Sequence, residues 1–260
     1  MEQKKPAYPR HTRLLGAQAA VFQPRVAAAH RTEAVAAALT GGSPVERGTR
    51  HVWPYPQKHQ PQNTETQVRK LKIIEHISLD GVIQHSADDG DFPYSDWTAP
   101  YRTPAGRDAV MAAQGERFDL LLGRRTYDIW SGFWPKAPSS PIGDRLNAAT
   151  KFIATHRPES LEWGPFESLG PDIVEGIRRI KSQDGPDLIL WGSSTLTSTV
   201  LERGLADEVV LIAYPVLLGM GKRFFAEGTP ARSFELVSTN ALPSGIIFST
   251  YKVAGPLKTG

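Results

Sequence analysis

The chain has 260 residues, with 30 Lys or Arg against 27 Asp or Glu, and it contains no cysteine. The missing thiol excludes disulfides, zinc–thiolate centres, iron–sulfur clusters and a cysteine nucleophile. Residues 1–67 carry a net charge of +5 and the remaining residues −2, so the basic character belongs to the N-terminal segment. We therefore expect no nucleic-acid-binding face, and no apolar run approaches the roughly 18 residues of a membrane helix.

The N-terminal segment differs in composition from the rest of the chain. Residues 1–67 are rich in Ala, Pro, Arg and Gln and lack an alternation of apolar and polar positions. Such a segment buries too little apolar surface to pack, so we predict a disordered or artefactual extension followed by one domain over residues 68–260. An organelle transit peptide is the alternative. The absence of cysteine fits a cytoplasmic protein.

From Val68 onward, short apolar runs alternate with amphipathic stretches, which is typical of an α/β domain. The runs predict strands at Lys70–Ile77, Phe118–Leu122, Lys151–Thr155, Leu188–Trp191, Val209–Tyr214, Phe234–Ser238 and Ile246–Val253. Helices are predicted at Ala105–Glu116, Thr126–Ser131, Pro171–Ser182 and Ser194–Arg203. Pro171 suits the first position of the third helix, and Gly204 suits the position that ends the fourth. The early strands are continuously apolar, as parallel strands are, and Pro243-Ser244-Gly245 predicts a terminal antiparallel hairpin. We expect a mixed, mostly parallel sheet with helices on both sides.

Two segments share one plan: LLLGRRTY at Leu120–Tyr127 and LILWGSSTL at Leu188–Leu196. In each, an apolar strand runs into a glycine and then into the start of a predicted helix. Free N–H groups at a helix N-terminus attract anions, and glycine lets an anion approach the main chain. Two such turns predict a ligand with more than one phosphate, contacted by Gly123, Arg124, Arg125 and Thr126 and by Gly192, Ser193, Ser194 and Thr195.

A third apolar strand ends in Thr155, His156 and Arg157. Ligands of open α/β sheets bind beside the carboxyl ends of strands, and clustered arginines favour a 2′-phosphorylated nucleotide. Both turns also have a plain structural interpretation. Solvated arginines are common after a strand, and serine and threonine routinely cap helices.

Asp80, in Ser78-Leu79-Asp80-Gly81, is the best-placed carboxylate for substrate binding or proton donation. Asp-Gly is also a common turn pair, so a structural role is the alternative. Trp130 and Trp134 follow the first phosphate turn, either as core residues or as rings that face a flat substrate. No pair of histidines has metal-ligand spacing, and we expect no metal site.

These residues, in this order, resemble the dihydrofolate-reductase-like superfamily, especially stand-alone relatives of the reductase domain of riboflavin-biosynthesis deaminase-reductases. The resemblance runs from Leu71 to Val253 and is carried by ISLDG, DLLLGRRTYDIW, KFIATHR, LILWGSSTL, LERGLADEVVLIAYPVLLGMGKRFF and PSGIIFSTYKV. At the second turn, where dihydrofolate reductases have Gly-Gly, this chain has Gly192-Ser193.

The resemblance implies NADPH as the hydride donor. By this resemblance, residues Gly123–Thr126 contact phosphates and residues Gly192–Leu196 contact the diphosphate. Residues Thr155–Arg157 contact the adenosine end. The loop after Asp80 approaches the nicotinamide. The resemblance also implies a homodimer, mediated by the LLGMGKRFF segment and the terminal strands.

We therefore expect an NADPH-dependent reductase that transfers hydride to a small heterocyclic C=N or C=O group, pyrimidine- or pterin-like, with a proton from Asp80 or water. The alternative is a non-catalytic NADP(H)-binding sensor or partner module with the same fold. A flavin-binding reductase is a third hypothesis, with only the same phosphate turns in its favour.

Overall fold

The computed structural model describes residues 68–85 and 92–259, so the predicted extension over residues 1–67 lies outside the described residues. The strands are β1 (Leu71–Ile77), β2 (Phe118–Gly123), β3 (Lys151–Ala154), β4 (Phe166–Ser168), β5 (Asp187–Trp191), β6 (Glu208–Ala213), β7 (Arg232–Ala241) and β8 (Ile247–Pro256). The α-helices are α1 (Pro104–Gln114), α2 (Arg124–Phe133), α3 (Pro141–Ala148), α4 (Ile173–Lys181) and α5 (Ser194–Glu202). Two short 3-10 helices are η2 (Ala99–Tyr101) and η3 (Pro158–Ser160).

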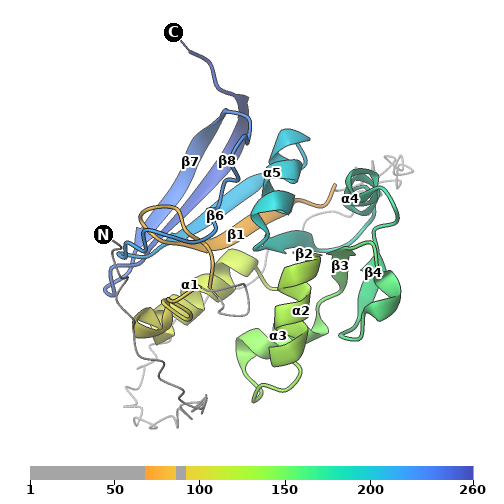
Figure 1. The fold of residues 1–260 in the computed structure, drawn as a ribbon, viewed down its shortest axis with the longest axis horizontal. Helices are drawn as coiled ribbons and strands as arrows, with labels where there is room; N and C mark the ends of the chain where they lie inside the picture. Colours follow the sequence, from red (N-terminus) through yellow and green to blue (C-terminus); the bar gives the residue numbers. More distant parts are fainter. Residues whose placement is uncertain (1–67, 86–91, 260) are drawn as a thin grey trace, which may run out of the picture. The chain divides into compact units, whose positions relative to one another are not determined.

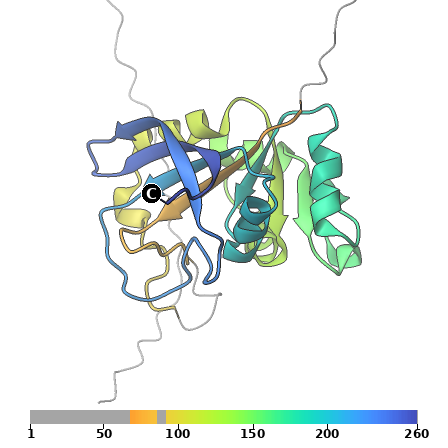
Figure 2. The same ribbon diagram turned by 90° about the horizontal axis from the view of Figure 1, so that it is seen from above.

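The strands form one eight-stranded sheet in the order β4-β3-β2-β5-β1-β6-β8-β7. Each neighbouring pair from β4 to β6 is parallel, whereas β8 runs antiparallel to both β6 and β7. Figure 2 shows the β7–β8 hairpin in blue at one end of the sheet. The predicted fold class is confirmed in its architecture: a mixed, mostly parallel sheet flanked by helices, with a C-terminal antiparallel hairpin.

Two apolar cores lie on the two faces of the sheet, with α1, α2 and α3 on one face and α4 and α5 on the other (Figure 1). Successive side chains of a strand point to opposite faces. Ile74 of β1 therefore packs in the core on the α1–α3 face, and Ile73 in the core on the α4–α5 face. Burial on both faces explains the continuously apolar sequences of the central strands.

The structure differs from the sequence-based expectations at several boundaries. Helix α4 begins at Ile173, and Asp172 caps it, so Pro171 precedes the helix and does not occupy its first position. Helix α2 begins at Arg124, two residues earlier than predicted, which places both arginines in its first turn. Strand β4 and helix α3 were not predicted. Gly204 has the expected left-handed φ of +64° after α5.

Candidate functional site

The predicted phosphate turns follow strands that are neighbours in the sheet. Strands β3, β2, β5 and β1 lie side by side and are parallel, so their carboxyl ends meet at the same edge. Thr155–Arg157 follow β3, Gly123 ends β2, and Gly192 follows β5. The structure thus brings the three predicted strand ends together at one edge of the sheet.

The two glycine turns contact each other directly. A Cβ atom placed on Gly123 would lie 2.7 Å from Oγ and 2.9 Å from Cβ of Ser193. In the opposite direction, a Cβ on Gly192 would lie 2.8 Å from Oγ1 of Thr126. Real Cβ atoms essentially never approach other atoms so closely, so both positions require glycine on steric grounds. The N-termini of α2 and α5 are packed as a pair by these contacts.

The second turn has an unusual backbone. Gly192 and Ser193 have φ values of +65° and +61°, the left-handed region that side chains rarely adopt. Such a conformation costs a non-glycine residue about 1–2 kcal/mol. The hydrogen bond that the Ser193 hydroxyl accepts from the Leu196 amide, at 3.3 Å, offsets part of this strain energy. Strained backbone of this kind gathers at binding sites.

Helix α2 lacks the usual cap at its start. In the described part of the chain, α1, α3, α4 and α5 each have an N-terminal side chain that accepts a backbone N–H, but Gly123 gives α2 none. Neither α2 nor α5 has an acidic residue in its first turn, where a carboxylate would compete with a bound anion. The amide N–H groups of Arg124 and Arg125 at this uncapped start are suited to donate hydrogen bonds to an anion.

Arg124 links the first turn to the end of β3. Its Nε donates to Asp128 at 2.8 Å, and Nη1 donates to the Arg157 carbonyl at 3.0 Å and to Ser160 Oγ at 2.7 Å. Oγ1 of Thr155 accepts the Arg157 amide at 3.0 Å. His156, Arg157 and Arg125 are exposed at this edge. The guanidinium of Arg124 therefore holds the third strand end beside the first turn.

Asp80 is held as a charged hydrogen-bond acceptor. Its Oδ1 accepts the Ser78 hydroxyl at 2.6 Å and the Leu218 amide at 3.2 Å, and Oδ2 accepts the Gly219 amide at 2.8 Å. The bond from Ser78 is the largest cause that lowers the pKa of Asp80 to about 2. Such a carboxylate has no proton to give at neutral pH. These bonds favour the structural alternative for Asp80, which ties the loop after β6 to the end of β1, over the expected proton donor.

Glu75 lies beneath the second turn and was missed by the sequence analysis. This β1 side chain is buried, and its carboxyl accepts the backbone N–H groups of His76 and Gly192. Burial raises the pKa of Glu75 to about 8, so the carboxyl is protonated at neutral pH. Its Oε2 has no hydrogen-bond partner among the described residues. The neutral state keeps a negative charge away from a turn that is suited to bind phosphate.

A cluster of aromatic rings lies next to the turns on the α1–α3 face of the sheet. Trp191, the residue before Gly192, stacks on His76 with ring centroids 5.4 Å apart, and its ring lies 6.2 Å from Trp130. Trp134 lies 6.1 Å from Trp130. Trp130 on α2 and Trp134, the residue that follows α2, were both expected as substrate contacts, and both are half-buried beside this cluster. The signal for both Glu75 and His76 in the sequence was a pair of adjacent polar side chains near the end of β1.

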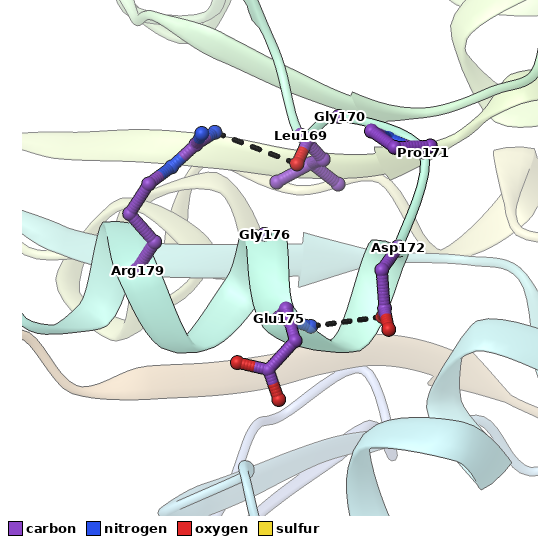
Figure 3. A pocket seen from close by; sticks show the side chains of 7 residues that line it. All are labelled: Leu169, Gly170, Pro171, Asp172, Glu175, Gly176 and Arg179. Atoms are coloured by element: carbon purple, nitrogen blue, oxygen red, sulfur yellow. Dashed lines mark hydrogen bonds between the residues drawn. The ribbon is translucent and has the colours of Figure 1, made fainter.

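Two cavities open on the described surface, and one of them borders the first glycine turn. One, of about 350 Å³, lies between the loop before α4 and α4 itself (Figure 3). Its polar groups bond to one another: Asp172 accepts the Glu175 amide, and Arg179 donates to the Leu169 carbonyl. The other, of about 370 Å³, lies beside Tyr127 and Trp163. Neither is lined by Gly123–Thr126 or Gly192–Leu196, although Tyr127 and Asp128 of the second cavity follow Thr126 directly.

No helix in the described part of the chain is long and apolar enough to cross a membrane. Residues 68–85 and 92–259 also contain no group of three or more His, Asp or Glu side chains placed to hold a metal ion.

Comparisons with known proteins agree with this architecture. Residues 69–248 match the RibD C-terminal domain family. Two uncharacterized proteins of Bacillus subtilis (strain 168) are similar. YyaP is 26% identical over 51% of this chain and 72% of its own length. YwjB is 24% identical over 66% of this chain and 91% of its own length. A putative riboflavin biosynthesis protein from Shewanella sp. PV-4 has a similar structure, with a TM-score of 0.54, 23% identity, and coverage of 71% of this chain and 98% of that one.

The family match covers more than half of the chain and includes every strand and helix that positions the two glycine turns. Membership supports a reductase-like function at the level of the family. The chain belongs to the RibD C-terminal domain family.

Proposed function

We propose that this protein is an NADPH-dependent reductase that transfers hydride to a small heterocyclic acceptor, pyrimidine- or pterin-like. The observation that carries the proposal is the pairing of two glycine turns, one at the uncapped start of α2 and one at the strained start of α5. Backbone amides at two adjacent helix N-termini suit a diphosphate, whose two phosphates need donors a few ångströms apart.

The residues present fit this cofactor. Gly123, Arg124, Arg125 and Thr126 would bind one phosphate of the diphosphate, and Gly192–Leu196 the other. Thr155, His156 and Arg157, which Arg124 holds beside the first turn, would bind the adenosine end. The exposed guanidinium of Arg157 suits a 2′-phosphate, because arginine binds phosphate through two parallel hydrogen bonds.

In this reaction the main role of the side chains is to position the cofactor and the acceptor. When bound, NADPH supplies the hydride with its electron pair. The acceptor carbon gains the hydride, the π electrons of its C=N or C=O bond move to the heteroatom, and that atom takes a proton from water. Asp80, with its low pKa, keeps the loop after β1 in place rather than donating this proton.

Titration calorimetry with NADPH and NADH tests the cofactor assignment. We expect NADPH to bind the wild-type protein at least tenfold more tightly, which is about 1.4 kcal/mol. The variant Arg157→Gln should lose most of this preference. Arg203→Gln, which changes an exposed arginine at the other end of α5, should keep it. Equal affinity for both nucleotides contradicts the proposal.

The alternative function, a non-catalytic NADP(H)-binding module, makes a different prediction. Oxidation of NADPH is followed at 340 nm with dihydrofolate, pterins and aminopyrimidine ribosides as acceptors. Turnover with at least one of these acceptors supports the reductase. Tight NADPH binding with no oxidation in the presence of any of them favours the sensor or partner module.

We also propose a homodimer and a cytoplasmic location. Several apolar side chains are exposed on the loop after β6 and on the edge strand β7, among them Leu217, Met220, Phe225 and Leu236. Such a group of exposed apolar residues is typical of an interface. Sedimentation velocity should give twice the mass of one chain, and Leu217→Asp with Leu236→Asp should give a monomer.

A further inference from the structure

The most unusual group outside the phosphate turns is His76, in the centre of a ring cluster at the carboxyl end of β1. We define the His76 cluster as His76, His85, Trp97, Trp191 and Tyr214. The His76 ring centroid lies 5.4 Å from that of Trp191, 5.6 Å from Tyr214 and 6.3 Å from His85, and Trp97 contacts Tyr214 edge-on at 5.2 Å. Aromatic rings with a few polar atoms typify sites for flat ligands.

One nitrogen of His76 is occupied and the other is open. Nδ1 lies 2.9 Å from the Tyr214 hydroxyl. Burial raises the pKa of Tyr214 to about 12, so its hydroxyl stays protonated and is able to donate. Among the described residues the side-chain hydrogen bond of His76 is the one at Nδ1, which leaves Nε2 without a partner there, and the residue as a whole is partly exposed. If Tyr214 donates to Nδ1, the imidazole proton resides on Nε2.

The surroundings of His76 oppose a positive charge. Burial, His85 and Arg102 lower the pKa of His76 to about 3, so the ring is neutral at all ordinary pH values. The carboxylate of Asp96 lies 3.9 Å from His85 Nε2 and pairs with Arg102, which leaves little net charge at this end of the cluster. His85 Nε2 in turn bonds Thr98 Oγ1 at 2.7 Å. A cationic ligand would meet the same opposition as a charged imidazole.

The cluster adjoins the proposed cofactor site through the chain itself. Trp191, which stacks on His76, is followed directly by Gly192 of the second turn. Strand β1, which contains His76, is the neighbour of β5 in the sheet. The ring cluster and the two glycine turns are therefore consecutive parts of the same sheet edge.

We propose that His76, fixed by Tyr214 with its proton on Nε2, donates a hydrogen bond to the heteroatom of the reducible C=O or C=N group, and that the acceptor is an uncharged planar ring that lies against the partly exposed His76. This inference rests on the proposed function and specifies its substrate class. A neutral imidazole is an effective electrophile for a carbonyl, because it polarises the bond while keeping its own proton. The proton that the heteroatom gains still comes from water.

The test uses lumazine, an uncharged planar pteridine dione, as the probe and tryptophan fluorescence as the readout, with and without NADPH. His76→Phe keeps a ring against Trp191 but removes the donor, and His76→Gln restores an N–H. We expect His76→Phe to weaken lumazine binding at least tenfold and His76→Gln to recover part of it. NADPH affinity should stay within twofold in each variant. Tyr214→Phe should weaken lumazine binding, whereas Tyr101→Phe, which removes a hydroxyl from another ring packed on Tyr214, should not.

The outcomes separate this inference from the proposed function. Equal lumazine affinity in wild type and His76→Phe overturns the inference, and so does NADPH binding without any lumazine binding. Lumazine binding that depends on His76 in a protein that does not bind NADPH overturns the proposed function alone. Nitrogen-15 spectra of the histidine ring report the tautomer independently of activity. A proton on Nδ1 of His76 contradicts the role assigned to Tyr214.

Discussion

The turns that end β2 and β5 have the same plan in the sequence but require glycine for different reasons. Gly123 has an ordinary φ of −70°, and only the side chain of Ser193 fills the space where its Cβ would lie. Gly192 has a left-handed φ of +65° and also faces Thr126. The first glycine is thus a steric requirement and the second both steric and conformational. A glycine after a strand therefore does not by itself show whether the site needs the absence of a Cβ atom or the freedom to adopt a positive φ.

Gly192→Ala should have the largest effect. Left-handed backbone strain and the contact with Thr126 add up to about 3 kcal/mol of lost stability. Thermal or urea unfolding measures this loss. The matched control is Gly132→Ala, at an exposed position of α2 with nothing within 4 Å, which should leave stability unchanged or raise it slightly. Adding Thr126→Ala should restore only part of the loss, because the φ strain remains; full restoration contradicts the distinction between the turns.

Gly123→Ala should cost about 2 kcal/mol, through overpacking against Ser193 alone. Ser193→Gly by itself should be nearly neutral, since it loses a cap but relieves left-handed strain. In the double variant the clash is gone, so stability should return close to that of Ser193→Gly. A double-mutant cycle from urea unfolding measures this coupling. Additive losses in the cycle show that the two turns do not pack as described.

The stability of the second turn should depend on pH because the buried Glu75 lies beneath it, whereas no such group lies beneath the first turn in the described structure. The folded pKa of about 8 lies above the ordinary 4.5, so the folded protein holds a proton that the unfolded chain releases between these values. The contribution of Glu75 to stability should therefore fall as pH rises from about 5 to 8, by at most about 1.4 kcal/mol per pH unit, and level off above 8. His76, whose folded pKa lies below its ordinary value, has the opposite slope up to about pH 6.5, so the Glu75 effect is read from the difference between the wild type and a Glu75 variant. Glu75→Gln should flatten this part of the profile. An unchanged slope in the variant refutes the buried, protonated state.

Deleting residues 1–67 should have the smallest effect, since both turns and all contacts between them lie beyond this segment. The remaining chain begins with Val68 and keeps Arg69, which is buried, pairs with Asp119 and lies over the Phe152 ring. We expect an unchanged melting temperature and NADPH affinity. A drop of several degrees would show that the segment stabilises the domain.

Most of the fold was predictable because its signals are local. Continuous apolar strands, the left-handed Gly204 and the Pro243-Ser244-Gly245 turn each reflect a preference of neighbouring residues. Strand β4 was missed because its three residues are exposed and show no apolar pattern. Helix α3 was missed although Ser140 and Pro141 are a good cap and first residue, since the short proline-rich stretch is also typical of a loop.

The site was predictable in its parts but not in its connections. Glycines, arginines and hydroxyls after three strands were visible along the chain. The contact of Gly123 with Ser193, the bond from Arg124 to the Arg157 carbonyl and the stack of His76 on Trp191 join residues far apart in sequence. The pKa of Glu75 and that of Asp80 depend on burial and on partners that only the folded chain supplies.

The central claim is that the two paired turns bind the diphosphate of NADPH. Backbone amide chemical shifts, recorded while NADPH is added, test it most directly. The account predicts that the largest changes occur at the amides of Gly123–Thr126 and Gly192–Leu196, followed by those of His156 and Arg157. Changes centred on the Leu169–Arg179 cavity, or no changes at the two turns, would contradict it.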